Sequence, residues 1–103
     1  EDLPGRLAPM DLDFVLEKNG HILVQEYKPK GVSLSLGQRI TLKALVRAGQ
    51  DVSLVWDEEG SDFVEVGAMD RNGNVAFVER MSTRKLRNRV LDWLQAAMDE
   101  PKD

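Results

Sequence analysis

Hydrophobic and polar residues alternate in two stretches of the chain, at 11–18 and 21–28, on either side of an Asn-Gly dipeptide. Alternation is typical of a strand that buries one face. Asn-Gly is the strongest short signal for a two-residue hairpin turn. We therefore expect these stretches to form an antiparallel hairpin.

The segment 35–48 has the spacing of an amphipathic helix. Ser35 has the residue type of an N-cap, and Gln38, three residues later, completes a capping box. Gly49 is expected to end the helix, since glycine readily adopts the backbone conformation that follows a last helical turn. The apolar face is expected to contain Ile40, Leu42, Leu45 and Val46.

The pattern after this helix predicts three more strands. Residues 51–57 alternate between apolar and polar positions. The segments 62–70 and 74–80 are typical of a second hairpin that turns at Asn72-Gly73. The sequence DRNGN lacks the glycine spacing and the closing glutamate of a calcium-binding loop, so we expect only a turn there.

A second helix is predicted near the end of the sequence. Ser82 or Thr83 would cap it, and Pro101 would end it. Its apolar stripe is expected to consist of Leu86, Val90, Trp93, Leu94, Ala97 and Met98.

The predicted order of elements is β-β-α-β-β-β-α. It indicates an α/β fold, with a mixed central sheet flanked by helices. Residues 1–103 would form one domain, in which 1–10 is an irregular arm, 11–56 is the core region, and 57–103 adds the second hairpin and the last helix.

Length and composition agree with one compact domain, since the chain has 103 residues of which 42% are apolar. No stretch approaches the roughly 20 apolar residues of a membrane-spanning helix. The first ten residues lack the basic and apolar parts of a signal peptide. We therefore expect a cytoplasmic protein without a membrane partner, and the compact design suggests a bacterial or phage origin.

The chain contains no cysteine and a single histidine, His21. Disulfides, zinc-thiolate sites and thiol nucleophiles are therefore excluded. A bound metal would be held by oxygen ligands, which favour Mg²⁺, Mn²⁺ or Ca²⁺ over zinc.

The formal net charge is −4, whereas proteins that coat nucleic acid are usually basic. Basic residues are nevertheless grouped. Arg39, Lys43 and Arg47 recur every four residues on the first helix, and together with Lys30 they could follow a phosphate backbone. The alternative is an ordinary solvated helix face. A second basic group consists of Arg84, Lys85, Arg87 and Arg89.

Acidic residues gather at one end of the first hairpin. The two-residue turn fixes the register, which places Asp13 opposite Glu26 and Asp11 opposite Lys28. Like charges directly opposite each other destabilise a sheet, and such violations concentrate at functional sites. A divalent cation between Asp13 and Glu26 would remove the repulsion. The alternative is an exposed strand end that tolerates it.

The register also assigns the two faces of the hairpin, because successive side chains of a strand point to opposite sides. One face is expected to carry Asp11, Asp13, Val15, Glu17, Ile22, Val24, Glu26 and Lys28. The other is expected to be core and to carry Leu12, Phe14, Leu16, Leu23 and Tyr27.

The order of these residues resembles a known signature. Asp13, followed after twelve residues by Glu26-Tyr27-Lys28, is similar to the D…ExK motif of the PD-(D/E)XK nuclease superfamily. The chain is most similar to the small VRR-NUC and Holliday-junction-resolvase members. In VRR-NUC-like proteins the ExK strand tends to be followed by a short loop, a Ser and a Gln that open a helix, then a Gly and an apolar strand, as in residues 28–56.

This resemblance covers about residues 9–56, and it implies a restriction-endonuclease-like core. It further implies Asp13 and Glu26 as ligands of Mg²⁺ or Mn²⁺, Lys28 as the catalytic lysine, and Gln38 as a further catalytic residue.

The sequence departs from the motif at its Pro-Asp pair, because Met10 separates Pro9 from Asp11. Asp11 therefore competes with Asp13 for the role of metal ligand. Two alternatives are structural. Lys28 could form a salt bridge with Asp11, and Gln38 could serve only the helix cap.

The resemblance implies a Mg²⁺-dependent DNA endonuclease, selective for structures such as junctions or flaps. It also allows a homodimer, since two sites are needed to cut two strands. No small-molecule organic cofactor is expected. The alternative is an interaction module that keeps the nuclease-like scaffold and binds protein or DNA without cutting it.

Overall fold

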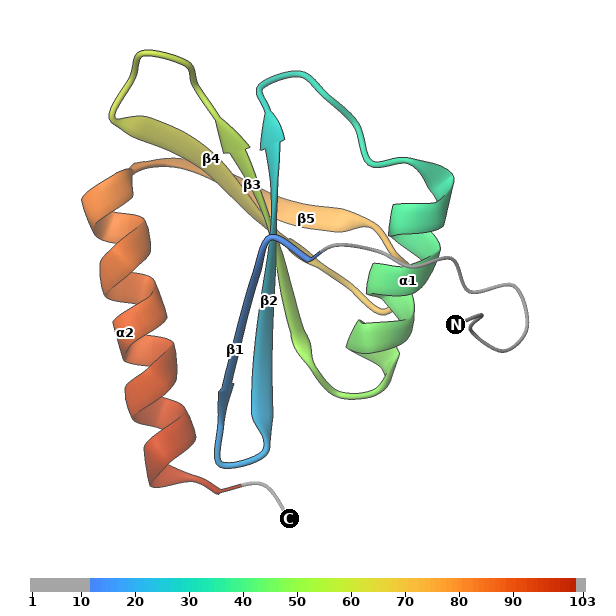
Figure 1. Ribbon diagram of the computed structural model, residues 1–103, viewed down its shortest axis with the longest axis vertical. Helices are drawn as coiled ribbons and strands as arrows, with labels where there is room; N and C mark the ends of the chain where they lie inside the picture. The colour runs from blue at the N-terminus through green and yellow to red at the C-terminus, as the bar shows by residue number, and fades with distance from the viewer. Residues whose placement is uncertain (1–11, 102–103) are drawn as a thin grey trace.

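The computed structural model describes residues 12–101 and contains the elements in the expected order. Figure 1 shows a sheet, seen nearly edge-on, with one helix on each side. The elements are β1 (Phe14–Lys18), β2 (His21–Pro29), α1 (Leu36–Arg47), β3 (Asp51–Asp57), β4 (Phe63–Met69), β5 (Val75–Ser82) and α2 (Thr83–Asp99). The prediction of a single α/β domain with a mixed sheet is confirmed.

The sheet has five strands in the order β1-β2-β3-β4-β5. β2 and β3 are parallel, whereas the other neighbouring pairs are antiparallel. Parallel neighbours need a crossover connection, usually a helix, and α1 supplies it. The second hairpin extends the sheet beyond β3. The carboxyl ends of β2 and β3 consequently lie side by side.

Each face of the sheet has its own apolar core. Leu54 and Val55 of the central strand β3 are both 0% exposed and point to opposite faces, so β3 is buried on both sides. The core beneath α1 consists of Val24, Leu42, Val52, Leu54 and Met69. The core beneath α2 consists of Val55, Val64, Val66, Met81 and Leu86.

Helix α1 begins where the capping box predicts. The Oγ of Ser35 accepts the N–H of Gln38, and the Oε1 of Gln38 accepts the N–H of Ser35. Leu42 faces the core, but Ile40 is 53% exposed, so its assignment to the apolar face was wrong. Ile40 lies two residues from Leu42, and this spacing turns it away from the sheet.

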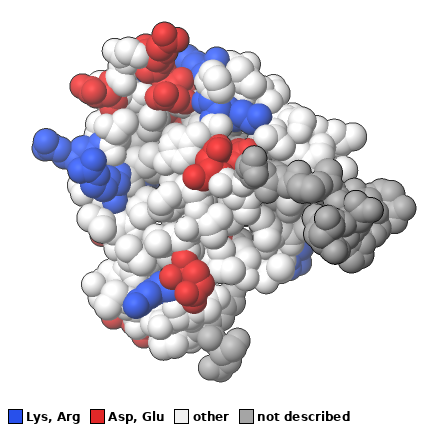
Figure 2. Space-filling view, in the orientation of Figure 1, with Lys and Arg blue, Asp and Glu red and all other residues white. Residues whose placement is uncertain are grey.

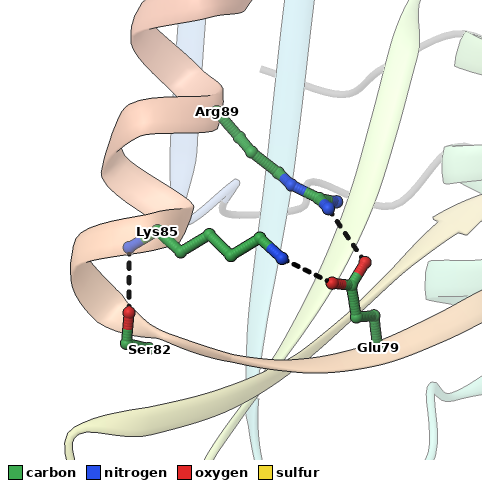
Figure 3. A network of polar contacts seen from close by, with 4 residues as sticks. All are labelled: Glu79, Ser82, Lys85 and Arg89. Atoms are coloured by element: carbon green, nitrogen blue, oxygen red, sulfur yellow. Dashed lines mark hydrogen bonds and ion pairs between the residues drawn. The ribbon is translucent and has the colours of Figure 1, made fainter.

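Helix α2 is capped by Ser82, whose Oγ accepts the N–H of Lys85 (Figure 3). Leu86 and Ala97 are buried as expected, whereas Met98 is 51% exposed, so its place in the apolar stripe was wrong. The buried part of α2 is therefore narrower than predicted and consists of Leu86 and Ala97. No helix within residues 12–101 is long and apolar enough to cross a membrane.

The first hairpin turn lies against the end of α2. The side-chain amide of Asn19 donates to the carbonyl of Ala97 at 3.2 Å. The ring Nε2 of His21 bonds the carbonyl of Glu100. These contacts satisfy carbonyl groups that have no partner within the helix.

The second hairpin turns at the predicted place, but through five residues, since Met69 pairs with Val75. The Oδ1 of Asp70 accepts the N–H groups of Asn72 and Asn74, both at 2.9 Å. Such side-chain bonds stabilise turns. The loop is thus held by Asp70.

Candidate metal-binding site

The register of the first hairpin brings Asp13 to Glu26. Phe14 pairs with Gln25, which confirms the register that the turn predicts. One step further, the backbone N–H of Tyr27 donates to the Oδ2 of Asp13 at 2.8 Å. Asp13 therefore sits at the end of the strand ladder, with its carboxylate fixed beside β2.

Glu26 is a buried carboxylate that is only partly satisfied. Glu26 is only 3% exposed. Its Oε2 accepts the Nε2 of Gln38 at 3.0 Å, while its Oε1 has no partner. A buried polar atom without a partner destabilises the fold and calls for an explanation. A cation bound to Oε1 would supply that explanation.

The surroundings of Glu26 disfavour its charged form. Burial raises the pKa of the Glu26 carboxyl above its usual value, and the negative charge of Asp13 raises it further. The positive charge of Lys28 acts in the opposite direction as a smaller effect. This combination of burial and a like charge is typical of a site that a cation would complete.

Gln38 forms the predicted helix cap and also contacts Glu26. Its backbone N–H and its Oε1 form the capping box with Ser35, at 3.1 and 3.0 Å. Its remaining side-chain atom, Nε2, reaches Glu26. The first turn of α1 is thereby attached to β2, and the orientation of the Glu26 carboxylate depends on the helix cap.

Lys28 lies on the same side of β2 as Glu26 and is half-buried. Within residues 12–101 its ammonium group forms no ion pair or hydrogen bond, so it is free to meet an anion. Asp11, its predicted cross-strand partner, lies outside the described residues. Asp11 and Asp13 therefore both remain candidates for the metal ligand.

The donor set fits a hard cation that keeps part of its hydration shell. Among the described residues, no three of the types His, Cys, Asp and Glu come together as a ligand cluster. Mg²⁺ commonly binds proteins through one or two carboxylates and completes its shell with water and substrate phosphates. Asp13 and Glu26, with the orphaned Oε1, match this pattern.

The basic stripe on α1 has a structural task. The guanidinium of Arg39 donates to the carbonyl of Gly73, and the Nε of Arg47 donates to the carbonyl of Arg71 at 2.8 Å. Lys43 packs over Gly73, where a β-carbon would meet its Cδ at 2.9 Å. The stripe therefore holds the β4–β5 turn. Arg39 and Arg47 donate to backbone carbonyls in these contacts, so no acidic side chain neutralises their charges there.

Lys30 lies just past the end of β2 and is exposed. Its backbone N–H donates to the carbonyl of Asp57 at 2.9 Å. Its charge helps to lower the pKa of the Glu58 carboxyl, an effect that comes mainly from the bond between Glu58 and Arg80. Lys30 thus belongs to the same end of the sheet as the carboxylate pair.

The assignment of Tyr27 to the core was wrong, since Tyr27 is 41% exposed. It lies on the side of β2 that faces α2, as the alternation predicts, where it lines an open groove together with Thr83 and Arg87 of α2. Its hydroxyl donates to the Oε1 of Gln25 at 3.0 Å. Gln25 was not singled out from the sequence, although a glutamine on an apolar face was a signal.

Figure 2 shows a group of basic side chains at the level where α2 begins in Figure 1, with acidic side chains gathered at the top of the molecule. Figure 3 shows that part of the basic group is paired, because Lys85 and Arg89 both bond Glu79, at 2.8 and 2.9 Å. Arg84 and Arg87 form no ion pair or side-chain hydrogen bond with any described residue.

Comparison of the chain with family models, with curated proteins and with solved structures found no match. The resemblance to the PD-(D/E)XK superfamily therefore stays a prediction, and the functional argument rests on the geometry of the site itself.

Proposed function

We propose that the protein is a Mg²⁺- or Mn²⁺-dependent DNA endonuclease. The observation that carries this proposal is the buried carboxylate of Glu26, which has an orphaned Oε1 and lies beside the anchored carboxylate of Asp13. Junctions or flaps are the substrates that the resemblance implies. The order D…ExK on a hairpin next to a crossover helix supports the same function.

The residues of the site have separable tasks in such a reaction. Asp13 and Glu26 would hold the metal, and a bound metal would acidify a water molecule and offset charge that builds on phosphorus. Gln38 holds one oxygen of Glu26 and leaves the other free. The N–H of Tyr27 holds Asp13.

Lys28 would act on the phosphate itself. Hydrolysis joins a water oxygen to phosphorus and breaks the ester bond to a sugar oxygen, which takes up a proton. Negative charge accumulates on the phosphate oxygens between these events, and a positioned cation stabilises it. The ammonium of Lys28 lies on the Glu26 side of β2 and has no described partner, so it can take this role.

A non-catalytic interaction module is the second candidate. The described residues supply two acids at the site, without a third ligand nearby. A module of this kind would keep the scaffold and bind DNA or protein without cutting it.

Cleavage of labelled DNA separates the two functions. Duplex, flapped and four-way-junction DNA would be incubated with the parent, with Glu26→Gln and with Glu100→Gln, in Mn²⁺ and in EDTA. Glu100 is an exposed glutamate at the far end of α2, so its variant controls for the loss of one charge. If the protein is a nuclease of this kind, the parent should cut DNA only when metal is present, and Glu26→Gln should not cut. Equal cutting by the parent and Glu26→Gln would refute it.

A further inference from the structure

A groove lies between α2 and the sheet, on the face opposite the candidate metal site. Its lining includes Phe14, Tyr27, Arg87 and Val90, and its volume is about 390 Å³. A second hollow of about 270 Å³ adjoins it and shares Gln25 with it. Pockets of roughly 300–1,000 Å³ are the usual size of small-ligand sites. We call the first of these hollows the Tyr27 groove.

The groove holds a free hydrogen-bond donor. Gln25 is 3% exposed and contributes to both hollows. Its Oε1 is occupied by the hydroxyl of Tyr27. Its Nε2 has no hydrogen-bond partner among the described residues, and the side chain lines both hollows. A buried amide that lines a cavity calls for a polar ligand.

The rim of the groove carries one basic residue, Arg87, and one acidic residue, Asp57. Arg84 lies one turn before Arg87 on the same helix. Neither guanidinium has an acidic partner within residues 12–101, in contrast to Lys85 and Arg89, which share Glu79. The first turn of α2 also contains no acidic residue. These two guanidiniums are therefore available to an anionic ligand.

The groove is tied to the metal site through Tyr27. The ring of Tyr27 borders the groove on one side of β2, while its neighbours Glu26 and Lys28 face the other side. The backbone N–H of the same residue holds Asp13. The groove and the metal site therefore lie at the same end of β2, on opposite faces of the sheet.

We propose that the Tyr27 groove binds an unpaired nucleotide of the substrate strand. The base stacks on Tyr27, the amide of Gln25 bonds its polar edge, and Arg84 and Arg87 meet the flanking phosphates. An exposed aromatic ring, a buried amide and unpaired guanidiniums are the groups that bind single-stranded nucleic acid. This inference rests on the proposed function and narrows it to DNA that contains an unpaired nucleotide.

The test is binding in EDTA, which does not require a working metal site. Fluorescence anisotropy would compare a blunt duplex with the same duplex carrying a single-stranded overhang. We expect tighter binding of the overhang, and a loss of roughly 5- to 150-fold of its affinity in Tyr27→Ala. Tyr27→Phe keeps the ring but removes the hydroxyl that holds Gln25, so it should lose less affinity than Tyr27→Ala.

Charge is tested with a matched pair of variants. Arg87→Gln should weaken binding of the overhang duplex and lower the slope of log affinity against log salt by about one. Arg71→Gln removes the same charge from the β4–β5 turn, away from the groove, and should change the affinity little. An overhang that contains 5-iodouracil should cross-link to Tyr27 of the unaltered protein.

Equal binding of blunt and overhang duplexes, or equal losses in Arg87→Gln and Arg71→Gln, would overturn the inference. These outcomes are distinct from failure of the nuclease. Metal-dependent cutting with no effect of Tyr27→Ala would refute only the proposed role of the groove. Selective binding of the overhang without cutting would refute only the proposed nuclease activity.

Discussion

The side-chain amide of Gln38 donates a hydrogen bond of 3.0 Å to the Oε2 of Glu26, and it thereby connects the first turn of α1 to the buried carboxylate of β2. The same side chain closes the capping box with Ser35. The helix cap and the candidate site therefore share one residue, and their contributions can be separated by mutation.

Gln38→Leu should lower both stability and metal affinity. It removes one half of the capping box and leaves both oxygens of Glu26 without a partner. Loss of a cap costs about 0.5–2 kcal/mol, and an unsatisfied buried acceptor adds about 1–3 kcal/mol. Ser35→Ala is the control, because it removes the cap hydroxyl and leaves the bond to Glu26. Urea unfolding with and without Mn²⁺ should show a metal-dependent difference between the two variants.

Glu26 should make the protein less stable as pH rises. Its pKa is raised in the folded state, so the folded protein binds more protons than the unfolded chain above the usual carboxyl pKa. The stabilising contribution of the protonated form is complete below that value and is lost as pH increases through the raised pKa. Glu26→Gln should therefore be more stable than the parent at pH 8, by a margin that shrinks at pH 4 in urea titrations.

Metal should reverse this order of stability. A cation that binds only the folded protein stabilises it by about 2.7 kcal/mol when its concentration is one hundred times the Kd. Mn²⁺ should raise the Tm of the parent and leave that of Glu26→Gln unchanged. Calorimetric scans with Mn²⁺ or EDTA provide the measurement. An equal rise in both proteins would place the metal elsewhere.

Gly67→Ala should destabilise the second hairpin. A β-carbon on Gly67 would overlap the Cγ1 of Val75, at the irregular step between β4 and β5. Overpacking of this kind costs about 1–3 kcal/mol. Gly37→Ala is the matched control, since nothing lies within 4 Å of its β-carbon and alanine favours the helix. Equal unfolding midpoints would contradict the predicted contact.

The link between the first turn and α2 can be tested at Asn19. Asn19 has a φ of 53°, so Asn19→Gly keeps the backbone conformation and removes only the bonds from its amide. A lost hydrogen bond lowers stability by about 0.5–1.5 kcal/mol. Asn19→Ala adds backbone strain and should lower it further. Hydrogen exchange should quicken at the end of α2 in both variants, and unchanged exchange would argue against the link.

Local chemistry made much of the fold predictable. The Asn-Gly turn fixes the register of the first hairpin, and the pairing of Phe14 with Gln25 confirms it. The capping box locates the start of α1, because both of its bonds connect residues three positions apart. Interactions of this range depend on few other parts of the chain.

The remaining features depend on how elements pack. Alternation places Tyr27 on the α2 side, but the packing of α2 decides its exposure. The spacing of Arg39 and Arg47 shows a shared helix face, but only the fold brings the β4–β5 turn to that face. The bond from Gln38 to Glu26 likewise requires the crossover that sets α1 against β2.

The clasp between Asn19 and the carbonyl of Ala97 spans 78 positions of the sequence. The ribosome makes the hairpin before it makes α2. The hairpin therefore lacks this hydrogen bond until Ala97 has emerged. Folding during synthesis therefore cannot finish the acid-bearing strands early. Nascent chains that stall before Ala97 would present β1 as a loose edge, available to chaperones and to neighbouring chains.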